Sequence, residues 1–408
     1  MGILTMNCGS STLKFDLFES SDESNSTTHV AWGNIDTIGN SSGSPLHFNS
    51  EAGSRESMDV ILNHGEAAKI VLEWLESAQM NQRIDAIGHR IVHGGRRFVD
   101  PTIIDEPVIK EIEKLKSLAP LHNNAALLAI YACRKKLGDG LPMVGVFDTA
   151  FFRKLPMHAS MYAIPHEIAS KHHIQRYGFH GIAHRYMTEY YASLRSIQLD
   201  KVNVITLHLG AGCSAVAVMG GYAVDTSMGF TPLEGLMMGT RSGDLDPSLV
   251  GYISHQEGLR VDQVEKILNK SSGLLGVSGR SADMRELLHA EGEGDKRSAL
   301  AVEMFCYRVR KYIGAYLTVL GGAQAVIFGG GIGENSPEVR ARICRGMEWC
   351  GMILDAERNL SPYDFQGQIS REESPVRILA VRVNEGSVIA NDTRKYVTDQ
   401  RLEERRNF

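Results

Sequence analysis

The sequence predicts an α/β protein built from two similar lobes. Short apolar runs of strand length alternate with longer segments in which apolar residues recur at helical spacing. A strand, a glycine- and serine-rich turn and a second strand near the amino terminus recur as the same pattern about half a chain later. The length of 408 residues exceeds what one hydrophobic core usually holds and suits two or three domains, or two large ones with additions.

The first lobe is expected over residues 1–150. The apolar run 3–6 and the alternating segment 13–17 predict two strands, and the polar, glycine-containing stretch between them predicts a tight turn. A serine-rich stretch of hairpins and loops, two helices and a buried strand follow, at residues 20–57, 70–78, 123–136 and 143–147. The last strand delivers Asp148 at its end.

The second lobe is expected over residues 151–385. Residues 202–207 and 215–219 predict strands around the turn 208–214, which repeats the arrangement at the start of the chain. Apolar spacing predicts a long helix over 300–320 and a buried strand over 325–328. A glycine loop, 329–335, comes next, and Ser336 with Pro337 begins a helix that is expected to stop at Gly351.

Composition and charge exclude several classes of protein. Hydrophobic residues make up 43% and charged residues 22%, which is ordinary for a folded soluble protein and argues against a disordered, fibrous or membrane protein. The net charge of -5 supplies no basic field for bulk nucleic-acid or membrane-surface binding. The uncharged stretches 202–224 and 312–333 are interrupted by glycines, so they are not interpreted as membrane spans. No basic residue precedes Lys14, which argues against a signal peptide and predicts a cytoplasmic protein.

Cysteine and histidine spacing gives little support to a structural metal. The six cysteines form no CxxC pair, so small buried thiols are expected in place of a zinc ribbon or a disulfide framework. Two histidine pairs, His89 with His93 and His180 with His184, have the four-residue spacing of zinc ligands on a helix. No HExxH motif accompanies them, and zinc remains a rival hypothesis.

Glycine is the residue type in excess, at 41 of 408, or 10%, against an average of about 7%. The turns at 7–14 and 208–214 would expose backbone N–H groups, and the first also carries Ser10, Ser11 and Lys14, so that both could bind phosphate oxygens. Each turn alone is better explained as a tight hairpin that needs glycine, and the presence of two such turns is what favours phosphate binding. The segment 329–335 matches neither GxGxxG nor a Walker A loop, but its flat backbone could lie against an adenine or a ribose.

Charged residues on glycine-rich loops are candidate anion and metal ligands. Arg90 and Arg241 suit bidentate contacts to carboxylate or phosphoryl oxygens, although a surface ion pair would also explain either one. Asp148 and Glu385 could hold Mg²⁺ directly or through water, and a helix cap is the alternative for Asp148. Ser11 and Lys14 match the SxxK of penicillin-recognising hydrolases, but SDN, KTG and GxSxG are missing, so a hydrolase is disfavoured.

Taken together, these motifs resemble the acetate and propionate kinase family, within the larger group that shares the actin, hexokinase and Hsp70 nucleotide-binding fold. The resemblance runs nearly end to end and rests on NCGSSTLKF, GHRIVHGG, APLHN, VFDTAFF, YGFHGIAHRY, HLGAGCS, DTSMGFTPLEGLMMGTRSGDLDP, FGGGIGEN and NEG. It implies a two-lobed, ribonuclease H-like fold with a duplicated core and an active-site cleft between the lobes. The final helix, 386–399, would join the first lobe, and the second lobe would bind nucleotide and form a homodimer.

The same resemblance implies an activity and a set of site residues. The activity is the reversible transfer of the ATP γ-phosphoryl group to acetate, giving acetyl phosphate and ADP, with Mg²⁺ or Mn²⁺. The residues implied for catalysis are Asp148, Arg90, Arg241 and His180. The acyl pocket would use Arg90, Val92, Leu121, His122 and Pro232. The nucleotide would be bound by Asn7, Ser10, Lys14, His208, Gly210, Gly212, Asp283, Arg285, Gly331, Ile332 and Asn335, and the metal by Asn7 and Glu385.

Departures from the family pattern bear on substrate choice. Ala211 replaces the asparagine of HLGNG, which removes a side-chain contact to the phosphoryl donor, and Asn124-Ala-Ala follows APLHN where relatives often have prolines. Propionate or another short carboxylate is therefore an alternative acceptor. A sugar or polyol kinase and an ATP-dependent chaperone-like switch are alternatives from other classes, and the chain after the last motif has no room for the peptide-binding domain of a chaperone.

Overall fold

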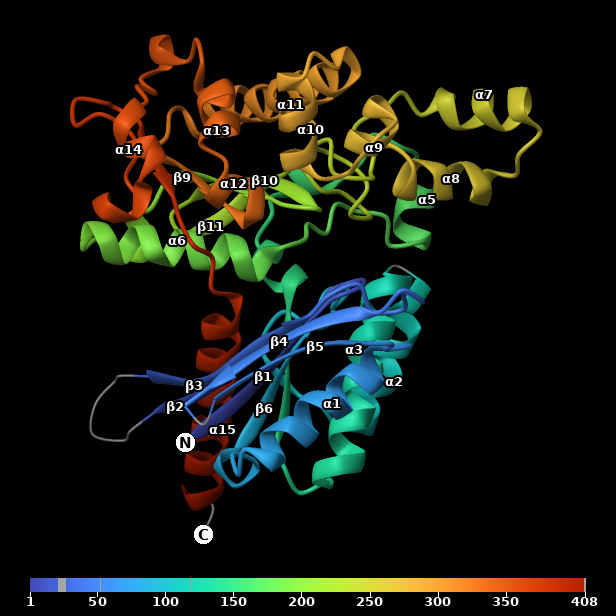
Figure 1. Ribbon diagram of the computed structural model, residues 1–408, viewed down its shortest axis with the longest axis vertical. Coiled ribbons are helices and arrows are strands. Elements are labelled where there is room, and N and C mark those ends of the chain that lie inside the picture. The colour runs from blue at the N-terminus through green and yellow to red at the C-terminus, as the bar shows by residue number, and fades with distance from the viewer. Residues whose placement is uncertain (21–26, 52, 118, 407–408) are drawn as a thin grey trace. The chain divides into compact units, whose positions relative to one another are not determined.

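The chain divides into two compact units in the computed structural model (Figure 1). The structure describes residues 1–20, 27–51, 53–117 and 119–406, without the side chains of Thr27, Ser117, Pro120, Leu121, Arg401 and residues 403–406. Unit 1 comprises Met1–Arg153 with Asn384–Phe408, and unit 2 comprises Lys154–Val383. The sequence placed these divisions at 150/151 and 385/386, so Glu385, assigned there to the second lobe, belongs to unit 1.

The sheet of unit 1 combines antiparallel and parallel strands. Its order is β5 (Gly53–Asp59), β4 (Ser44–Ser50), β3 (Thr27–Ile35), β2 (Leu13–Ser20), β1 (Gly2–Cys8), β6 (Ala86–Ile91), β8 (Met143–Phe147) and β7 (Thr102–Ile103). Strands β1 to β5 pair antiparallel, whereas β1, β6 and β8 run parallel to one another. The serine-rich stretch thus forms the antiparallel strands β3 to β5, as the predicted hairpins require.

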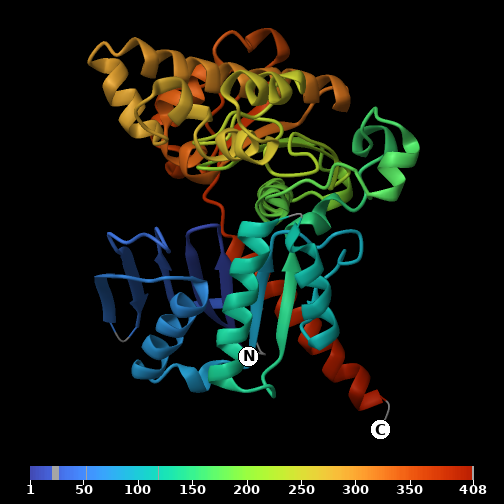
Figure 2. The ribbon, with the colours of Figure 1, turned by 90° about the vertical axis from the view of Figure 1, so that its right-hand side faces the viewer.

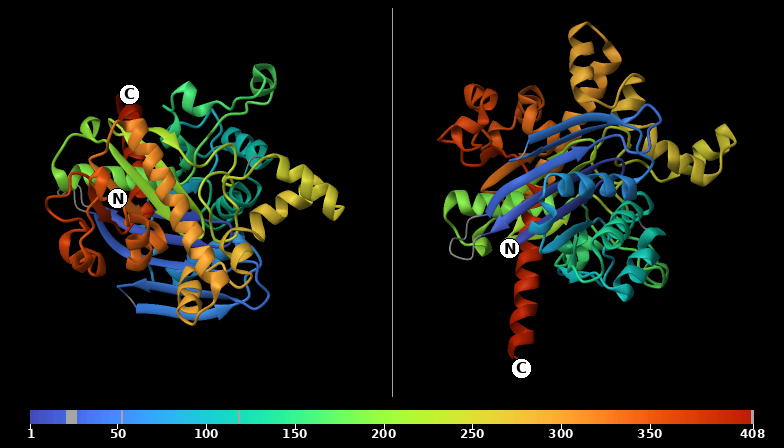
Figure 3. Two further views of the ribbon diagram at one scale, coloured as in Figure 1. Left: turned by 90° about the horizontal axis from the view of Figure 1, so that it is seen from above. Right: turned by 60° about the horizontal axis from the view of Figure 1, so that its bottom comes forward.

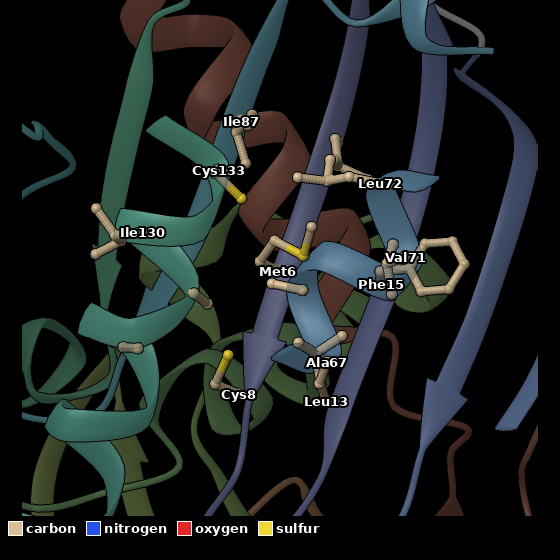
Figure 4. Close-up of a cluster of buried hydrophobic side chains, with 14 of the residues drawn as sticks. Met6, Cys8, Leu13, Phe15, Ala67, Val71, Leu72, Ile87, Ile130 and Cys133 are labelled. Atoms are coloured by element: carbon tan, nitrogen blue, oxygen red, sulfur yellow. The ribbon is translucent and has the colours of Figure 1, made fainter. Parts of the chain in front are cut away.

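Helices cover both faces of this sheet. The helices are α1 (His64–Ser77), α2 (Glu106–Lys114), α3 (Pro120–Leu137) and α15 (Glu385–Arg406), and the 3-10 turns are η1 (Asn81–Arg83), η2 (Leu115–Ser117) and η3 (Asp148–Phe152). One face packs against α1 and α3 through a hydrophobic core that includes Met6, Phe15, Val71, Leu72 and Ile130 (Figure 4). Helix α1 begins six residues before the predicted stretch because Asn63 caps it by accepting from the N–H groups of Gly65 and Glu66.

Helix α15 lies on the opposite face, along β1 and β6 (Figure 2). It is longer than the helix predicted over residues 386–399. Its close approach depends on Gly88 in β6, because a Cβ there would lie 2.4 Å from Oγ1 of Thr393 and 2.6 Å from Cγ2 of Ile389. The alternation of side chains in β6 therefore places Gly88 and Arg90 toward α15 and His89 toward the other face.

The sheet of unit 2 repeats the arrangement of unit 1. Its order is β11 (Tyr222–Thr226), β10 (Cys213–Met219), β9 (Val204–Leu209), β12 (Ala325–Gly329) and β13 (Arg377–Ala380). Strands β11, β10 and β9 are antiparallel neighbours, and β9, β12 and β13 run parallel. The strands β3, β2, β1, β6 and β8 of unit 1 have the same order: the first three are antiparallel neighbours and the last three run parallel. The internal duplication predicted from the two glycine turns is thereby confirmed.

Helices also flank the second sheet, with α6 and α11 on opposite faces (Figure 1). The pair α7 and α8 extends away from this sheet (Figure 3). The helices of unit 2 are α4 (Met157–Ser160), α5 (His166–Lys171), α6 (Gly181–Arg195), α7 (Ser248–Glu257), α8 (Val261–Lys270), α9 (Gly273–Ser278), α10 (Met284–Gly292), α11 (Lys296–Leu320), α12 (Gly330–Asn335), α13 (Pro337–Cys344) and α14 (Ala356–Leu360). Its 3-10 turns are η4 (Leu199–Lys201), η5 (Glu348–Cys350) and η6 (Pro362–Phe365).

Two predictions for the segment after β12 are corrected. The expected glycine loop is the end of β12 followed by the short helix α12. Gly330 allows this change of direction, since its φ of +76° is left-handed and a Cβ there would lie 2.8 Å from the carbonyl oxygen of Leu209. The next helix, α13, ends at Cys344 and not at Gly351, because Gly346 turns the chain with a φ of +73°.

The cysteines and the uncharged stretches can now be placed. All six cysteines are free, five of them buried and Cys350 half-buried, and burial raises the pKa of Cys8 to about 12. The uncharged stretches correspond to the β9–β10–β11 region and to the end of α11 with β12. Over the described part of the chain, no helix has the length and apolar character needed to cross a bilayer.

We predict that Gly88→Ala destabilises unit 1. The added methyl group must displace Thr393 or Ile389 of α15, and overpacking of this kind costs about 1–3 kcal/mol. The matched control is Gly140→Ala, because a Cβ at Gly140 has no neighbour within 4 Å. Thermal unfolding followed by circular dichroism should show a lower Tm for Gly88→Ala and no change for Gly140→Ala. Equal Tm values for both variants would contradict this packing of α15.

Candidate functional site

In unit 1, four candidate residues meet at one edge of the sheet. Asn7, Arg90 and Asp148 lie at or near the carboxyl ends of the parallel neighbours β1, β6 and β8, and Glu385 is the first residue of α15. The carboxyl ends of parallel strands share an edge, which is where ligands bind in open α/β sheets. The topology therefore gathers side chains that are up to 378 residues apart in the sequence.

Hydrogen bonds join these four residues into one network centred on Arg90. Its Nε and Nη2 donate to Oδ2 of Asp148 at 3.2 and 2.7 Å, and its Nη1 donates to Oδ1 of Asn7 at 2.9 Å. Nη1 also lies 3.4 Å from Oε2 of Glu385, which accepts from Nδ2 of Asn7 at 2.6 Å. The sequence suggested these residues separately, and the structure shows them in mutual contact.

The electrostatics of the network keep Arg90 charged. Burial alone would lower the pKa of the guanidinium, but the negative charges of Asp148 and Glu385 raise it above the ordinary value. Asp148 is fully buried, and its carboxylate accepts from Arg90 at the start of η3. Asp148 therefore forms an ion pair with Arg90, where a helix cap had been the alternative. The same ion pair lies in the interior, whereas the alternative for Arg90 had been an ion pair on the surface.

The β1–β2 turn adds exposed polar groups beside this network. Lys14 pairs with Asn7 across the two antiparallel strands, and directly paired residues project from the same face of a sheet. Ser10 lies in the turn, which is closed by the bond from the N–H of Gly9 to the carbonyl of Thr12 at 2.8 Å. Ser10 and Lys14 are both exposed, as groups that contact a phosphate would need to be.

The candidate acyl-pocket residues of unit 1 follow β6 and begin α3. Val92 is buried, His122 is half-buried, and the side chain of Leu121 lies outside the described residues. Asn123 holds the two segments together, because its Oδ1 accepts from the N–H of His93 at 3.1 Å and its Nδ2 donates to the carbonyl of His93 at 3.0 Å. Pro232, the remaining pocket candidate, belongs to unit 2.

Two residues that position this part of unit 1 were missed by the sequence reading. Asn123 is fully buried, and Oγ1 of Thr149 accepts from the N–H of Gly94 at 2.9 Å, which ties the loop after β6 to the turn that carries Asp148. Asn123 belongs to the APLHN motif and Thr149 to VFDTAFF, so membership in a motif was the available signal. Neither residue type indicates by itself that the side chain bonds to backbone.

The donor set of unit 1 suits a hard divalent cation. Asn7, Asp148 and Glu385 supply amide and carboxylate oxygens, which are the ligands that Mg²⁺ and Mn²⁺ prefer. The histidine pairs are used differently: burial lowers the pKa of His89 to about 3, and His184 bonds to two hydroxyl groups. Within the described ranges, no three histidine, cysteine, aspartate or glutamate residues are grouped to hold a metal.

In unit 2, the glycine turn between β9 and β10 is lined by cationic and imidazole groups. A Cβ built on Gly212 would lie 3.3 Å from Nε2 of His180 and 3.7 Å from Nη1 of Arg241. His180 precedes α6 with a left-handed φ of 56°, and its ring contacts that of His208 at a centroid distance of 4.5 Å. His180, His208, Gly212 and Arg241 are therefore neighbours, and the turn can present both backbone N–H groups and side-chain donors to an anion.

Arg241 differs from Arg90 in having no carboxylate partner among the described residues. Its Nη1 donates to the carbonyl of Pro232 at 3.2 Å and lies 3.9 Å from Sδ of Met238. Burial lowers the pKa of Arg241, and no aspartate or glutamate in the described part of the chain counteracts this effect. A half-buried guanidinium without a counter-ion beside exposed backbone N–H groups is an arrangement that favours binding of an anion.

The candidate adenosine residues lie on two sides of the same turn. A Cβ on Gly210 would lie 3.8 Å from the amide nitrogen of Gly331 in α12. In the same helix, Gly331 and Asn335 are exposed and Ile332 is half-buried. On the other side, the N–H of Gly239 donates to the carbonyl of Ala211 at 3.1 Å, and Gly239 also faces Ala282. Asp283 and Arg285 come next, where Asp283 caps α10 and the two side chains form an exposed ion pair at 2.6 Å.

A buried arginine that the sequence reading missed fixes α12. Arg340 is 1% exposed, and its Nη1 donates to the carbonyls of Gly333 and Glu334 at 2.8 and 2.9 Å. Its Nε and Nη2 bond to Asn359. Glu334 in turn accepts from the N–H groups of Gly330 and Val383 at 3.0 and 3.1 Å. An arginine in the middle of α13 carries no sequence signal for such a role, because only the tertiary structure brings the carbonyl end of α12 to it.

Comparison with known proteins assigns nearly the whole chain, including the candidate residues of each unit, to one family. Residues 2–391 match the model of the acetokinase family. The chain is 43% identical to the acetate kinase of Chloroherpeton thalassium, covering 97% of this chain and 99% of that protein, and 45% identical to that of Solibacter usitatus, covering 96% and 97%.

Solved structures agree with this assignment over nearly the whole chain. An acetate kinase from Porphyromonas gingivalis matches with a TM-score of 0.85 and 38% identity, and a propionate kinase from Francisella tularensis matches with a TM-score of 0.88 and 37% identity. Each comparison covers 97% of this chain and 99% of the other. The expected two-domain, actin- and hexokinase-like fold is thereby confirmed. The chain belongs to the acetokinase family of kinases, phosphotransferases that use a carboxyl group as the acceptor.

Proposed function

We propose that this protein is an acetate kinase that transfers the γ-phosphoryl group of ATP to acetate, reversibly, giving acetyl phosphate and ADP. The proposal rests on the arrangement of two arginines in a chain that matches acetate kinases over nearly its whole length. Arg241 lacks a carboxylate partner among the described residues and lies beside the glycine turn. Arg90 is kept charged near the carboxyl end of β6 by the carboxylate of Asp148. Both substrates of such a reaction are anions, and these groups suit their recognition.

In unit 1, we assign the acceptor and the metal to the network around Arg90. Arg90 binds the carboxylate of acetate, and Val92 and His122 supply the wall beside its methyl group, for which the resemblance also implied Leu121. Asn7 and Glu385, with Asp148 nearby, hold a divalent cation, Mg²⁺ or Mn²⁺. When bound, that cation offsets negative charge on the phosphoryl oxygens. Ser10 and Lys14 contact the phosphates from the β1–β2 turn.

In unit 2, we assign the nucleotide to the glycine turn and its neighbours. His208, Gly210 and Gly212 bind phosphate oxygens, and Asp283, Arg285, Gly331, Ile332 and Asn335 line the adenosine site. Arg241 neutralises charge on the group in transfer, and His180 donates a hydrogen bond to its oxygens. Pro232, whose carbonyl accepts from Arg241, adds apolar surface for the acyl group.

The reaction needs positioning and charge neutralisation more than proton transfer. A carboxylate acceptor is already ionised at neutral pH, so no general base has to remove a proton from it. The barrier arises from bringing two anions into line, and fixed guanidinium groups lower it by electrostatic stabilisation. Asp148 accordingly acts by positioning Arg90 and the metal. A sugar or polyol kinase, which must deprotonate a hydroxyl group, fits the family and this network less well.

We propose acetate and not propionate as the acceptor because the curated relatives described above are acetate kinases. The propionate kinase of Francisella tularensis is an equally good structural match, so propionate is the second candidate. Ala211, whose methyl group is exposed beside the turn, leaves the choice of phosphoryl donor to be measured. The predicted cytoplasmic location stays a prediction.

We also propose a homodimer formed through unit 2. Helix α11 presents Leu300, Met304 and Tyr307 to solvent at spacings of four and three residues, which places them on one side of the helix. Lys311 continues the row and lies over the ring of Tyr307. An apolar row of this kind on a helix surface suits burial against a second copy.

The activity prediction is tested with a panel of acceptors and donors. Acyl phosphate is trapped with hydroxylamine after incubation with formate, acetate, propionate or butyrate and Mg-ATP, Mg-GTP or pyrophosphate. Acetate with ATP should give the highest kcat/KM, and one extra methylene should cost about 10–200-fold. Removal of divalent metal with EDTA should abolish the reaction and added Mg²⁺ should restore it. Absence of acyl hydroxamate with every carboxylate would rule out the proposed function.

The role of Arg241 is tested by Arg241→Gln, which removes the charge without leaving a buried carboxylate unpaired. Loss of an electrostatic donor of this type lowers kcat by about 10²–10³-fold, while Tm should stay within a few degrees of the parent. Arg260→Gln is the matched control, because Arg260 forms an exposed ion pair with Asp262 on α8. A normal kcat in Arg241→Gln would show that Arg241 does not act on the transferred group.

The dimer prediction is tested by Met304→Glu, which places a charge in the centre of the exposed row on α11. Sedimentation velocity should show twice the chain mass for the parent and the monomer mass for the variant, since burial of an unpaired carboxylate is costly. Leu360→Glu is the control, because Leu360 is exposed at the end of α14, away from that row. A monomeric parent protein would contradict the proposed assembly.

A further inference from the structure

Four polar side chains of unit 2 form a chain of hydrogen bonds that ends at His180. Oγ1 of Thr206 lies 2.8 Å from Nδ1 of His184, and Nε2 of His184 lies 2.7 Å from Oγ of Ser214. The same Oγ lies 2.9 Å from Nδ1 of His180. Thr206, His184 and Ser214 are fully buried in β9, α6 and β10, so this chain runs through the interior to the glycine turn.

The hydroxyl of Thr206 sets the direction of the first bond. Among the described residues, Nδ1 of His184 is the partner of this buried hydroxyl. If Thr206 only accepted, its own hydrogen would have no acceptor in the core, and a buried donor without a partner is strongly disfavoured. Thr206 therefore donates to Nδ1 of His184. Burial, together with the nearby His208, lowers the pKa of His184 well below its ordinary value, so the ring is neutral and carries its hydrogen on Nε2.

The remaining bonds follow from the count of hydrogens. His184 donates from Nε2 to Oγ of Ser214, and Ser214 has one hydrogen left, which it donates to Nδ1 of His180. Nδ1 of His180 is then an acceptor, so a neutral His180 ring must carry its hydrogen on Nε2. That nitrogen is the one that faces the glycine turn, 3.3 Å from a Cβ built on Gly212.

We propose that Thr206, His184 and Ser214 are positioning residues that hold His180 in the tautomer with its hydrogen on Nε2. A neutral His180 then already offers a hydrogen-bond donor to a phosphoryl oxygen at the turn, without first taking up a proton. The left-handed backbone of His180 and its contact with the His208 ring keep the imidazole in place. The importance of this donor for catalysis rests on the proposed function, whereas the tautomer itself does not.

The tautomer is measured directly by NMR on the ligand-free protein labelled with ¹⁵N in its histidine rings. Long-range ¹H–¹⁵N spectra at pH 8 distinguish protonated from unprotonated ring nitrogens, and His180→Gln identifies the signals of His180. We expect a protonated Nε2 and an unprotonated Nδ1 in the parent protein. A hydrogen on Nδ1, or on both nitrogens, would overturn the proposal whatever the enzymatic activity proves to be.

Thr206→Val and Thr206→Ser are a matched pair of variants that test whether Thr206 sets the tautomer of His180. Valine keeps the shape but removes the donor that sets the direction, so both ring nitrogens of His180 should shift toward averaged values. Serine keeps the hydroxyl and should retain the parent spectrum. Unchanged His180 signals in a folded Thr206→Val protein would show that Thr206 does not control the tautomer, and the parent spectrum remains decisive if that variant does not fold.

The kinetic readout separates positioning from general loss of structure. Equal tautomer populations leave half of the His180 rings competent, so kcat of Thr206→Val should fall by about twofold or more with unchanged KM for both substrates. Thr206→Ser should restore kcat. A rise in KM without a change in kcat would contradict the positioning role. If the parent protein shows no acyl kinase activity, the proposed function fails, and the NMR result still decides the tautomer.

Discussion

The guanidinium of Arg90 is shared between the carboxylate of Asp148 and that of Glu385, with the amide of Asn7 completing the network. This interaction joins three parallel strands to the first residue of α15, so the edge of the sheet and the docking of the last helix depend on the same charges. Removing one partner of a buried ion pair costs about 3–5 kcal/mol, because the remaining charge stays buried without compensation. The geometry that suits substrate binding is thus also part of what holds unit 1 together.

Unit 2 uses the duplicated topology for a different electrostatic arrangement. Its β9–β10 turn corresponds to the β1–β2 turn of unit 1, and its strands run in the same order and directions. The arginine beside this turn, Arg241, has neutral partners, namely the carbonyl of Pro232 and the sulfur of Met238. Arg90 is held in place by the two carboxylates beside it, whereas Arg241 has no carboxylate beside it among the described residues, which favours binding of an anion there. The two copies of one architecture therefore hold their arginines in different electrostatic surroundings.

Close backbone approaches explain part of the glycine excess. Gly88 lets α15 lie against β6, Gly330 turns the chain into α12, and Gly212 lets the backbone approach the ring of His180. Polar side chains that are buried or half-buried support the backbone in both units. Asn123, Arg340 and Glu334 bond to backbone groups of the loops that carry the candidate site residues. These hydrogen bonds fix the backbone of the segments that carry the candidate site residues, and so they orient the exposed groups of those residues.

Local patterns in the sequence determined the α/β class, the repeated strand–turn–strand unit, several helices including the long α11, and the choice of candidate site residues. Period-2 and period-3.6 spacing, glycine turns and charged residues on them are properties of short segments, so they can be read without a structure. The tertiary structure decided which of those residues meet. Asn7, Arg90, Asp148 and Glu385 come together only because β1, β6 and β8 end at one edge and α15 begins there. It also decided that α12 is helical and that the His180 ring is reached by a buried chain of hydrogen bonds from Thr206. Such contacts depend on long-range packing and on the cost of burying an unpaired polar group, and neither is encoded in the spacing of one segment.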